Sequence, residues 1–123
     1  MKGAIQVKVV PHAEQRYDTI GDWQIDPHTQ NITIKVSRLG HPISELAVIV
    51  HELVEAFLCR LHGISDIDVD RFDFAWGDAE GEPGAHPDAP YHLQHMLAEQ
   101  VEHALVEACG MDWQEHEAMC DVS

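Results

Sequence analysis

Two side chains that commonly bind metals lie one helical turn apart in the most apolar stretch of the chain. His51 and Glu55 are four residues apart within the segment HELVE. On an α-helix such residues project from one face with Cβ atoms roughly 5–6 Å apart, so they can bind one ion. Glu52 follows about 100° round the helix, where it can hold a water and act as a general base. The segment therefore predicts a metal site with His51 and Glu55 as ligands and Glu52 as the catalytic residue.

A catalytic zinc site usually has three protein ligands and an open position, so one more ligand must come from elsewhere. We predict His95, which lies on the polar side of a helix expected after Pro90. His92 and Glu102 lie on the same side and remain alternatives for the third ligand.

This ligand set predicts hydrolysis if the ion is zinc. The metal lowers the pKa of its bound water toward about 7, and the metal-bound water attacks an amide- or ester-like bond. Glu52 takes the proton of that water and delivers it to the leaving group. Glu55 adds negative charge at the metal, which makes manganese and iron alternatives to zinc. The expected cofactor is one divalent ion, with its role, catalytic or structural, left open.

Three short segments with alternating hydrophobic residues come first in the chain, at 5–9, 22–26 and 32–36. This period of two is typical of half-buried strands. The last two are joined by a polar connection of hairpin length, residues 27–30, so they should pair antiparallel. Residues 1–40 therefore predict a small three-stranded antiparallel sheet.

Helical periods follow the strands. Residues 41–76 predict the helix that carries HELVE, capped by Ser44 and stopped by Gly63, and then a short helix over Asp66–Trp76. The apolar stripe of the HELVE helix is expected to face the core, opposite a polar stripe that contains His51 and Glu55.

The last third of the chain predicts a loop and two more helices. Residues 77–90 are rich in glycine, proline and aspartate, which favours a loop. Residues 91–123 predict a long helix ending at Gly110 and a short one anchored by Trp113. The expected core stripe of the long helix consists of Leu93, Leu97, Val101, Ala104, Leu105 and Ala108. We therefore predict a single α+β domain over residues 1–123, with three main helices after the sheet.

Charge and cysteine content limit the partners and the location. The 123 residues carry 7 basic and 22 acidic side chains, a formal net charge of −15, and such a field repels phosphate backbones and anionic lipid. Nucleic acid and membranes are therefore not expected ligands. Cys59, Cys109 and Cys120 lack metal-knuckle or redox-pair spacing, and the first residues lack the features of a signal peptide. Reduced thiols and a cytoplasmic location are expected.

The order of these elements resembles the zincin metallopeptidases, in which a sheet precedes a helix carrying HExxH and a further ligand follows. The matching positions are His51, Glu52 and Glu55, and Glu55 stands where zincins have a second histidine. Three segments, RYDTIGDW, HELVEAFLCRLHGI and GEPGAHPDAPYHLQH, more closely resemble a family of small uncharacterised bacteriophage and prophage proteins. This resemblance implies the cytoplasm of a bacterial host, a histidine at His95 and an acidic residue at Glu102.

Two other functions stay open at the level of sequence. Glu52 and Glu55, with Glu99 and Glu102, form paired ExxE motifs like those of two-metal nucleotide pyrophosphatases of the MazG type, which are all helical. Alternatively, the acidic surface could inhibit a host nucleic-acid-binding protein by mimicking the phosphate backbone. The sequence does not distinguish a peptide from a small-molecule substrate, and it leaves a host protein partner open.

Overall fold

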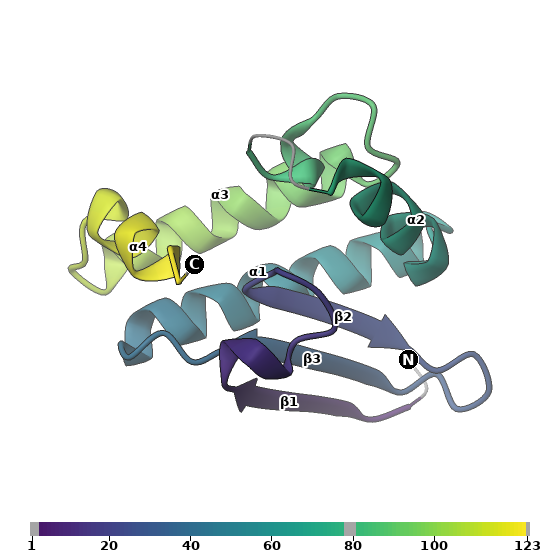
Figure 1. Ribbon diagram of the computed structural model, residues 1–123, viewed down its shortest axis with the longest axis horizontal. Coiled ribbons are helices and arrows are strands. Elements are labelled where there is room, and N and C mark those ends of the chain that lie inside the picture. The colour runs from purple at the N-terminus through teal and green to yellow at the C-terminus, as the bar shows by residue number, and fades with distance from the viewer. Residues whose placement is uncertain (1–2, 78–80, 123) are drawn as a thin grey trace.

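The computed structural model describes residues 3–77 and 81–122 of this α+β chain. In the described residues, three strands precede four α-helices: β1 (Ile5–Val10), β2 (Gly21–Ile25), β3 (Ile32–Ser37), α1 (Pro42–Leu61), α2 (Asp66–Trp76), α3 (His92–Ala108) and α4 (Trp113–Cys120). Short 3-10 turns occupy His12–Glu14 and Pro83–Ala85, and residues 78–80 of the predicted loop lie outside the described residues. Figure 1 shows α1 lying between the sheet and α3.

The sheet is mixed, with strand order β1-β3-β2. β2 and β3 pair antiparallel, with Trp23 opposite Ile34, as the short polar connection predicts. β1 pairs with β3 in parallel, with Val7 opposite Ile34, so the prediction of a wholly antiparallel sheet is wrong. The alternation of hydrophobic residues reports which face is covered and carries no information on strand direction.

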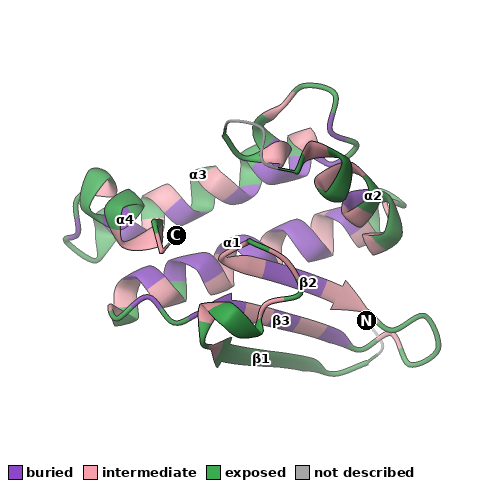
Figure 2. Ribbon diagram, viewed as in Figure 1, coloured by how far each residue is buried: buried purple, intermediate pink, exposed green. Residues whose placement is uncertain are grey.

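β1 differs from the other strands in its burial as well. Its residues are exposed apart from Val10, whereas Ile32, Ile34 and Val36 of β3 are fully buried under α1. Figure 2 shows β1 exposed at the edge of the sheet. The sequence predicts a half-buried strand here, and this is wrong because α1 covers the neighbouring strands and leaves the edge uncovered.

The bounds of α1 follow from local chemistry. His41 caps the helix, because its Nδ1 accepts a hydrogen bond from the Ile43 amide at 3.2 Å, and Pro42 starts the first turn. Ser44, the predicted cap, is buried inside the helix instead. The helix ends before Gly63, which adopts the left-handed φ of 72° that favours glycine.

The helices bury the faces that carry their polar residues. On α3 the buried residues are Gln94, His95, Ala98, Glu102 and Val106. Leu93, Leu97 and Val101 of the predicted core stripe are instead 71%, 45% and 43% exposed. On α1 the buried set includes His51, Glu52 and Glu55, together with Val48 and Ala56 of the hydrophobic core. The predicted orientation of α3 is therefore wrong, and α1 is buried on its polar side.

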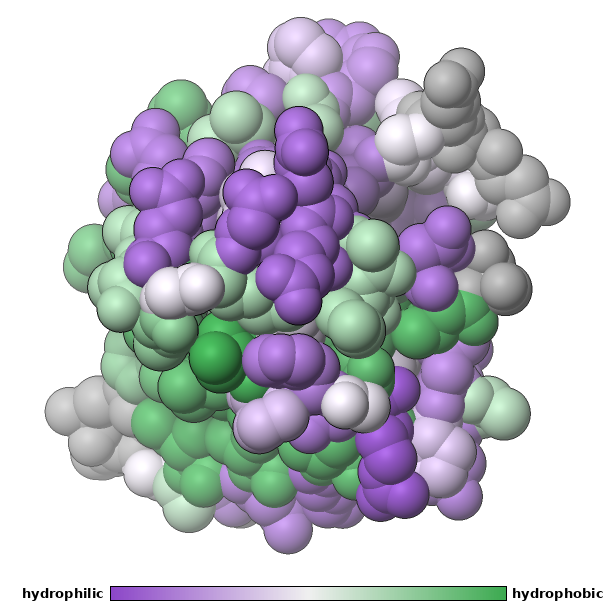
Figure 3. Space-filling view, turned by 90° about the vertical axis from the view of Figure 1, so that its left-hand side faces the viewer, coloured by the Kyte–Doolittle hydropathy of each residue, from purple (hydrophilic) through white to green (hydrophobic). Residues whose placement is uncertain are grey.

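Apolar side chains also reach the surface. Seen from the end at which α4 lies, an apolar region lies below a polar one (Figure 3). Within the described residues, no helix is both long enough and apolar enough to cross a bilayer.

Candidate metal centre

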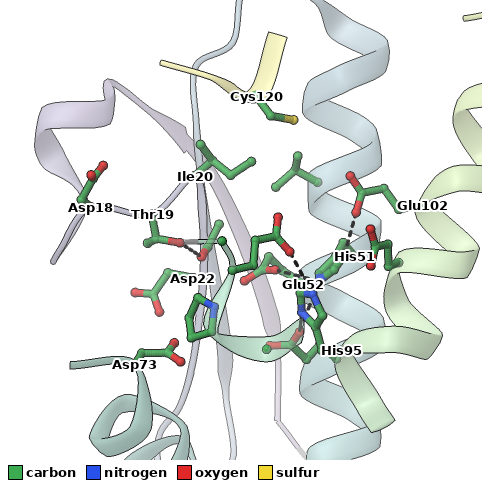
Figure 4. A pocket seen from close by; sticks show the side chains of 18 of the residues that line it. Asp18, Thr19, Ile20, Asp22, His51, Glu52, Asp73, His95, Glu102 and Cys120 are labelled. Carbon is green, nitrogen blue, oxygen red and sulfur yellow. Dashed lines mark hydrogen bonds and ion pairs between the residues drawn. The ribbon is translucent and has the colours of Figure 1, made fainter. Parts of the chain in front are cut away.

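The three predicted ligands converge where α3 crosses α1. Nε2 of His51 lies 3.2 Å from Oε2 of Glu55, and Nδ1 of His95 lies 3.1 Å from the same oxygen. One ligand atom from each residue lies within 4.8 Å of the others. All three side chains are buried, and Figure 4 shows His51, Glu52 and His95 gathered at one side of a pocket.

These separations fit a shared cation. Two ligand atoms bound to zinc at 2.0–2.1 Å in a tetrahedron lie ~3.3 Å apart, close to both distances to Glu55. The other nitrogen of His95, Nε2, is buried and lies 2.9 Å from Oε2 of Glu82, outside hydrogen-bond geometry. Histidine ligands commonly face a carboxylate on their second nitrogen. The donor set of two imidazoles and one carboxylate is therefore suitable for zinc.

Glu102 lies behind His51 and is not one of the converging ligands. Its Oε1 lies 2.6 Å from Nδ1 of His51, and its Oε2 lies 2.6 Å from Nε2 of His116. Because Nδ1 of His51 donates to Glu102, a neutral His51 presents the lone pair of Nε2 to Glu55. Glu102 therefore fixes the tautomer and orientation of His51. His92, the other alternative ligand, faces the Gly84 carbonyl at 2.9 Å and does not join the cluster.

Without a bound cation, protons compensate the buried negative charge. Burial alone would lower the pKa of His95, but the neighbouring carboxylates of Glu55 and Glu82 raise it to about 9. His51 follows the same pattern, since Glu102 and Glu55 outweigh burial and raise its pKa well above the usual value. Burial would raise the pKa of Glu55, but its bonds to both histidines lower it to about 2. The site therefore favours positive charge beside Glu55, which either protons or one divalent cation can supply.

Glu52 lies beside the ligands and has a different environment. Its Oε2 is 3.8 Å from Nε2 of His51, and burial, together with the nearby Glu55, raises its pKa well above the usual value. A Cβ atom at Gly21 would lie 2.8 Å from the Glu52 side chain, so β2 provides a close backbone wall there. Glu52 is thus a carboxyl group whose protonated form is favoured by its surroundings.

Other residues complete the site, and the sequence did not indicate them. The indole of Trp23 donates to Oε1 of Glu55 at 3.0 Å, which leaves Oε2 for the ligand cluster. A Cβ atom at Gly84 would lie 2.5 Å from Cγ of His95, so the 83–85 turn packs directly on that ring. No spacing signal links Trp23, Glu82 or His116 to the HELVE helix, because they reach it only through tertiary packing.

The ligands open onto a cavity of about 860 Å³. Among the residues that the structure describes, no lysine or arginine lines it, and ten acidic residues do: Asp18, Asp22, Glu52, Glu55, Asp73, Glu82, Glu99, Glu102, Glu117 and Asp121. On one wall Asp73 accepts hydrogen bonds from Tyr17 at 3.0 Å and Tyr91 at 2.5 Å. A cavity of one charge sign concentrates counter-ions, so this one attracts cations.

No protein-family profile, curated protein or solved structure matches this chain.

Proposed function

We propose that this protein binds one divalent metal ion, zinc in the first place, and hydrolyses an amide- or ester-like bond. His51, Glu55 and His95 would hold the ion, and Glu52 would act as general base and acid. The observation that carries the proposal is the position of Glu55 Oε2, within 3.2 Å of two imidazole nitrogens beside a large cavity. The order of sheet, HExxE helix and later ligand supports a zincin-like arrangement.

Glu55 is only 5% exposed, so its carboxylate is largely desolvated. An unpaired buried carboxylate is costly, and a divalent ion shared by three donors offsets that cost while it leaves the imidazoles neutral. When bound, such an ion polarises a carbonyl group and lowers the pKa of a water. The cavity gives a substrate access to the same place.

Glu52 supplies the proton transfers. Its carboxyl group lies one residue from a ligand and faces the cavity, where it can accept a proton from a water and deliver it to the leaving group. Burial and the nearby Glu55 raise the pKa of Glu52, which favours the half of the cycle in which it donates a proton to the leaving group. Manganese or iron can replace zinc with the same residues, since Glu55 is a hard oxygen ligand.

Metal analysis of protein purified without a histidine tag tests the first half of the proposal. We expect bound zinc, manganese or iron in the wild type and the loss of one equivalent in His51→Ala. His28→Ala is the matched control, since His28 is exposed in the β2–β3 turn. A wild type that binds no divalent ion, or a His51→Ala variant that binds as much as His28→Ala, would overturn the proposal and favour the acidic mimic.

Glu52→Gln tests the second half. The variant should retain the ion and lose at least about 100-fold in hydrolysis, the usual contribution of general acid–base catalysis. Panels of fluorogenic peptide amides and p-nitrophenyl esters serve as substrates. Hydrolysis that continues unchanged in Glu52→Gln would exclude Glu52 as the base.

A further inference from the structure

A second group of metal-ligating side chains lies on the other side of Glu102. Glu102 on α3 and His116 and Cys120 on α4 offer an oxygen, a nitrogen and a sulfur within 4.8 Å of one another. Figure 4 shows Cys120 on α4, with Glu102 nearby on α3. We propose that these three residues form a second cation site, separate from the His51–Glu55–His95 centre and suited to zinc or a similar borderline-soft divalent ion. This inference does not depend on the proposed function.

The geometry of the pair on α4 matches zinc. His116 and Cys120 are four residues apart, so they share one face of the helix, and Sγ lies 3.6 Å from Nε2. A sulfur bound to zinc at 2.3 Å and a nitrogen at 2.0–2.1 Å lie ~3.6 Å apart in a tetrahedron. The Glu102 oxygen is closer, 2.6 Å from Nε2, and would have to withdraw by roughly 0.7 Å to take a tetrahedral position.

The remaining nitrogen of His116 already has the partner that a ligating histidine needs. Nδ1 lies 2.9 Å from Oγ of Ser44, and the hydroxyl of Ser44 donates to Sδ of Met111 at 3.7 Å. Because the hydroxyl proton of Ser44 points to Met111, Oγ of Ser44 accepts a hydrogen bond from Nδ1 of His116. In a neutral His116, Nε2 then presents its lone pair to Glu102 and Cys120. His116 is fully buried, so this orientation is fixed by packing. A proton must separate Nε2 from Oε2 at 2.6 Å, and a cation can replace it.

An ion can reach this second site from solvent, and its binding displaces protons. Glu102, His116 and Cys120 all line the cavity described above, so an ion can enter from solvent. Burial and the nearby Glu102 raise the pKa of the Cys120 thiol to about 12, so it holds its proton when no ion is present. Binding therefore breaks the S–H bond, displaces the proton between Nε2 and Oε2, forms a metal–sulfur bond and releases two protons to solvent.

The second site would support the first through their shared neighbour. Oε1 of Glu102 orients His51, while Oε2 would bind the second ion. An ion held there fixes the carboxylate that sets the tautomer of His51, so occupancy of the second site should strengthen binding at the first.

Cobalt titration of the wild-type protein without a tag tests the proposal. Cobalt(II) replaces zinc and gives an intense near-ultraviolet charge-transfer band only where a thiolate binds it, and the His51–Glu55–His95 centre contains no sulfur. We expect two equivalents per chain and a thiolate band that accounts for one of them. The band should disappear in Cys120→Ser and persist in Cys109→Ser, the matched control, because Cys109 is exposed.

His51→Ala separates this inference from the proposed function. It should remove one equivalent and leave the thiolate band in place. One equivalent with the band in both the wild type and His51→Ala would mean that only the second site exists. The second-site proposal is overturned if the wild type shows no thiolate band, or if Cys120→Ser keeps the band at wild-type strength.

Discussion

Glu55 divides its two oxygens between different tasks. Oε1 accepts from the Trp23 indole, and Oε2 faces the two imidazoles. Its negative charge is thus compensated by neighbours inside the protein and hardly at all by solvent. The same contacts that lower the pKa of Glu55 raise those of His51 and His95, so protons and the proposed metal ion would compete for one position.

This competition predicts opposite pH dependences for metal-free and zinc-loaded protein. The folded-state pKa of His95 is raised from 6.5 to about 9, so its stabilising contribution is complete below 6.5 and is lost as the pH rises through about 9. Zinc needs deprotonated ligands, and its affinity should rise about tenfold per pH unit for each proton displaced. Melting curves with zinc and with a chelator should therefore separate progressively between these two pH values. A difference in melting temperature that stays constant over this pH range would contradict the prediction. So would a His95→Gln variant whose difference grows with pH as that of the wild type does.

Two glycines in contact with the site provide a matched pair of substitutions. In Gly84→Ala the new methyl group would lie 2.5 Å from the His95 ring, and in Gly21→Ala it would lie 2.8 Å from the Glu52 side chain. We expect Gly84→Ala to weaken zinc binding roughly 10–100-fold, as loss of ligand orientation does. Gly21→Ala should keep zinc affinity within a few-fold and impair hydrolysis. Isothermal titration and the fluorogenic assay measure the two effects, and equal zinc affinities would contradict this assignment.

The sequence predicts the centre of the site and misses its periphery. His51, Glu52 and Glu55 follow from one local spacing, and His95 follows from its position on the polar side of a helix. The supporting contacts of Glu82 and His116 join segments far apart in the chain, which a local pattern cannot report. Glu102, an alternative third ligand at the level of sequence, hydrogen-bonds to His51 at 2.6 Å and does not join His51, Glu55 and His95 in their cluster.

At the scale of elements, the positions of the strands and helices follow the periodicity of the sequence, but the choice of the buried face of α3 does not. The sequence predicts that the stripe of α3 that includes Leu93, Leu97 and Val101 is buried, because hydrophobic residues normally line the core. α3 instead turns His95 and Glu102 toward α1, where the polar residues of both helices form one hydrogen-bonded cluster. Binary patterning fails here because the interface is a polar site, the usual place for such exceptions.

Because the polar face of α3 is the buried one, a leucine and an alanine on this helix should differ in how much their substitution changes stability. Leu97→Gln changes a residue that is 45% exposed, so the free energy of unfolding should change by no more than about 0.5 kcal/mol. Ala98→Leu inserts a large side chain at a fully buried position and should destabilise by about 1–3 kcal/mol. Urea unfolding measures both values. A larger loss for Leu97→Gln than for Ala98→Leu would show that the leucine face is the buried one.

At the scale of the whole molecule, the net charge of −15 opposes compaction. Arg16 relieves part of this repulsion by pairing with Asp22 at 2.7 Å and Asp70 at 3.0 Å, but seven basic residues cannot balance twenty-two acidic ones. The cavity concentrates acidic side chains further. Long-range repulsion should therefore outweigh local ion pairs.

Added salt should therefore stabilise the metal-free protein. Raising sodium chloride from 0.01 M to 0.1 M shortens the Debye length from about 30 Å to about 10 Å, which screens the repulsion between distant carboxylates. The melting temperature of metal-free protein should rise by a few degrees. A melting temperature that falls over this range would mean that local pairs such as Arg16–Asp22 dominate.

The indole of Trp23 touches one ligand cluster, and that of Trp113 packs 5.2 Å from the His116 ring in the other. Each cluster thus has its own built-in fluorophore, whose emission responds to charge placed beside the ring. With the third tryptophan removed by Trp76→Phe, the further change Trp113→Phe would leave Trp23 to follow events at Glu55, and Trp23→Phe would leave Trp113 to follow those at His116. Binding of the proposed ion at either cluster could then be followed separately in real time, without any added dye.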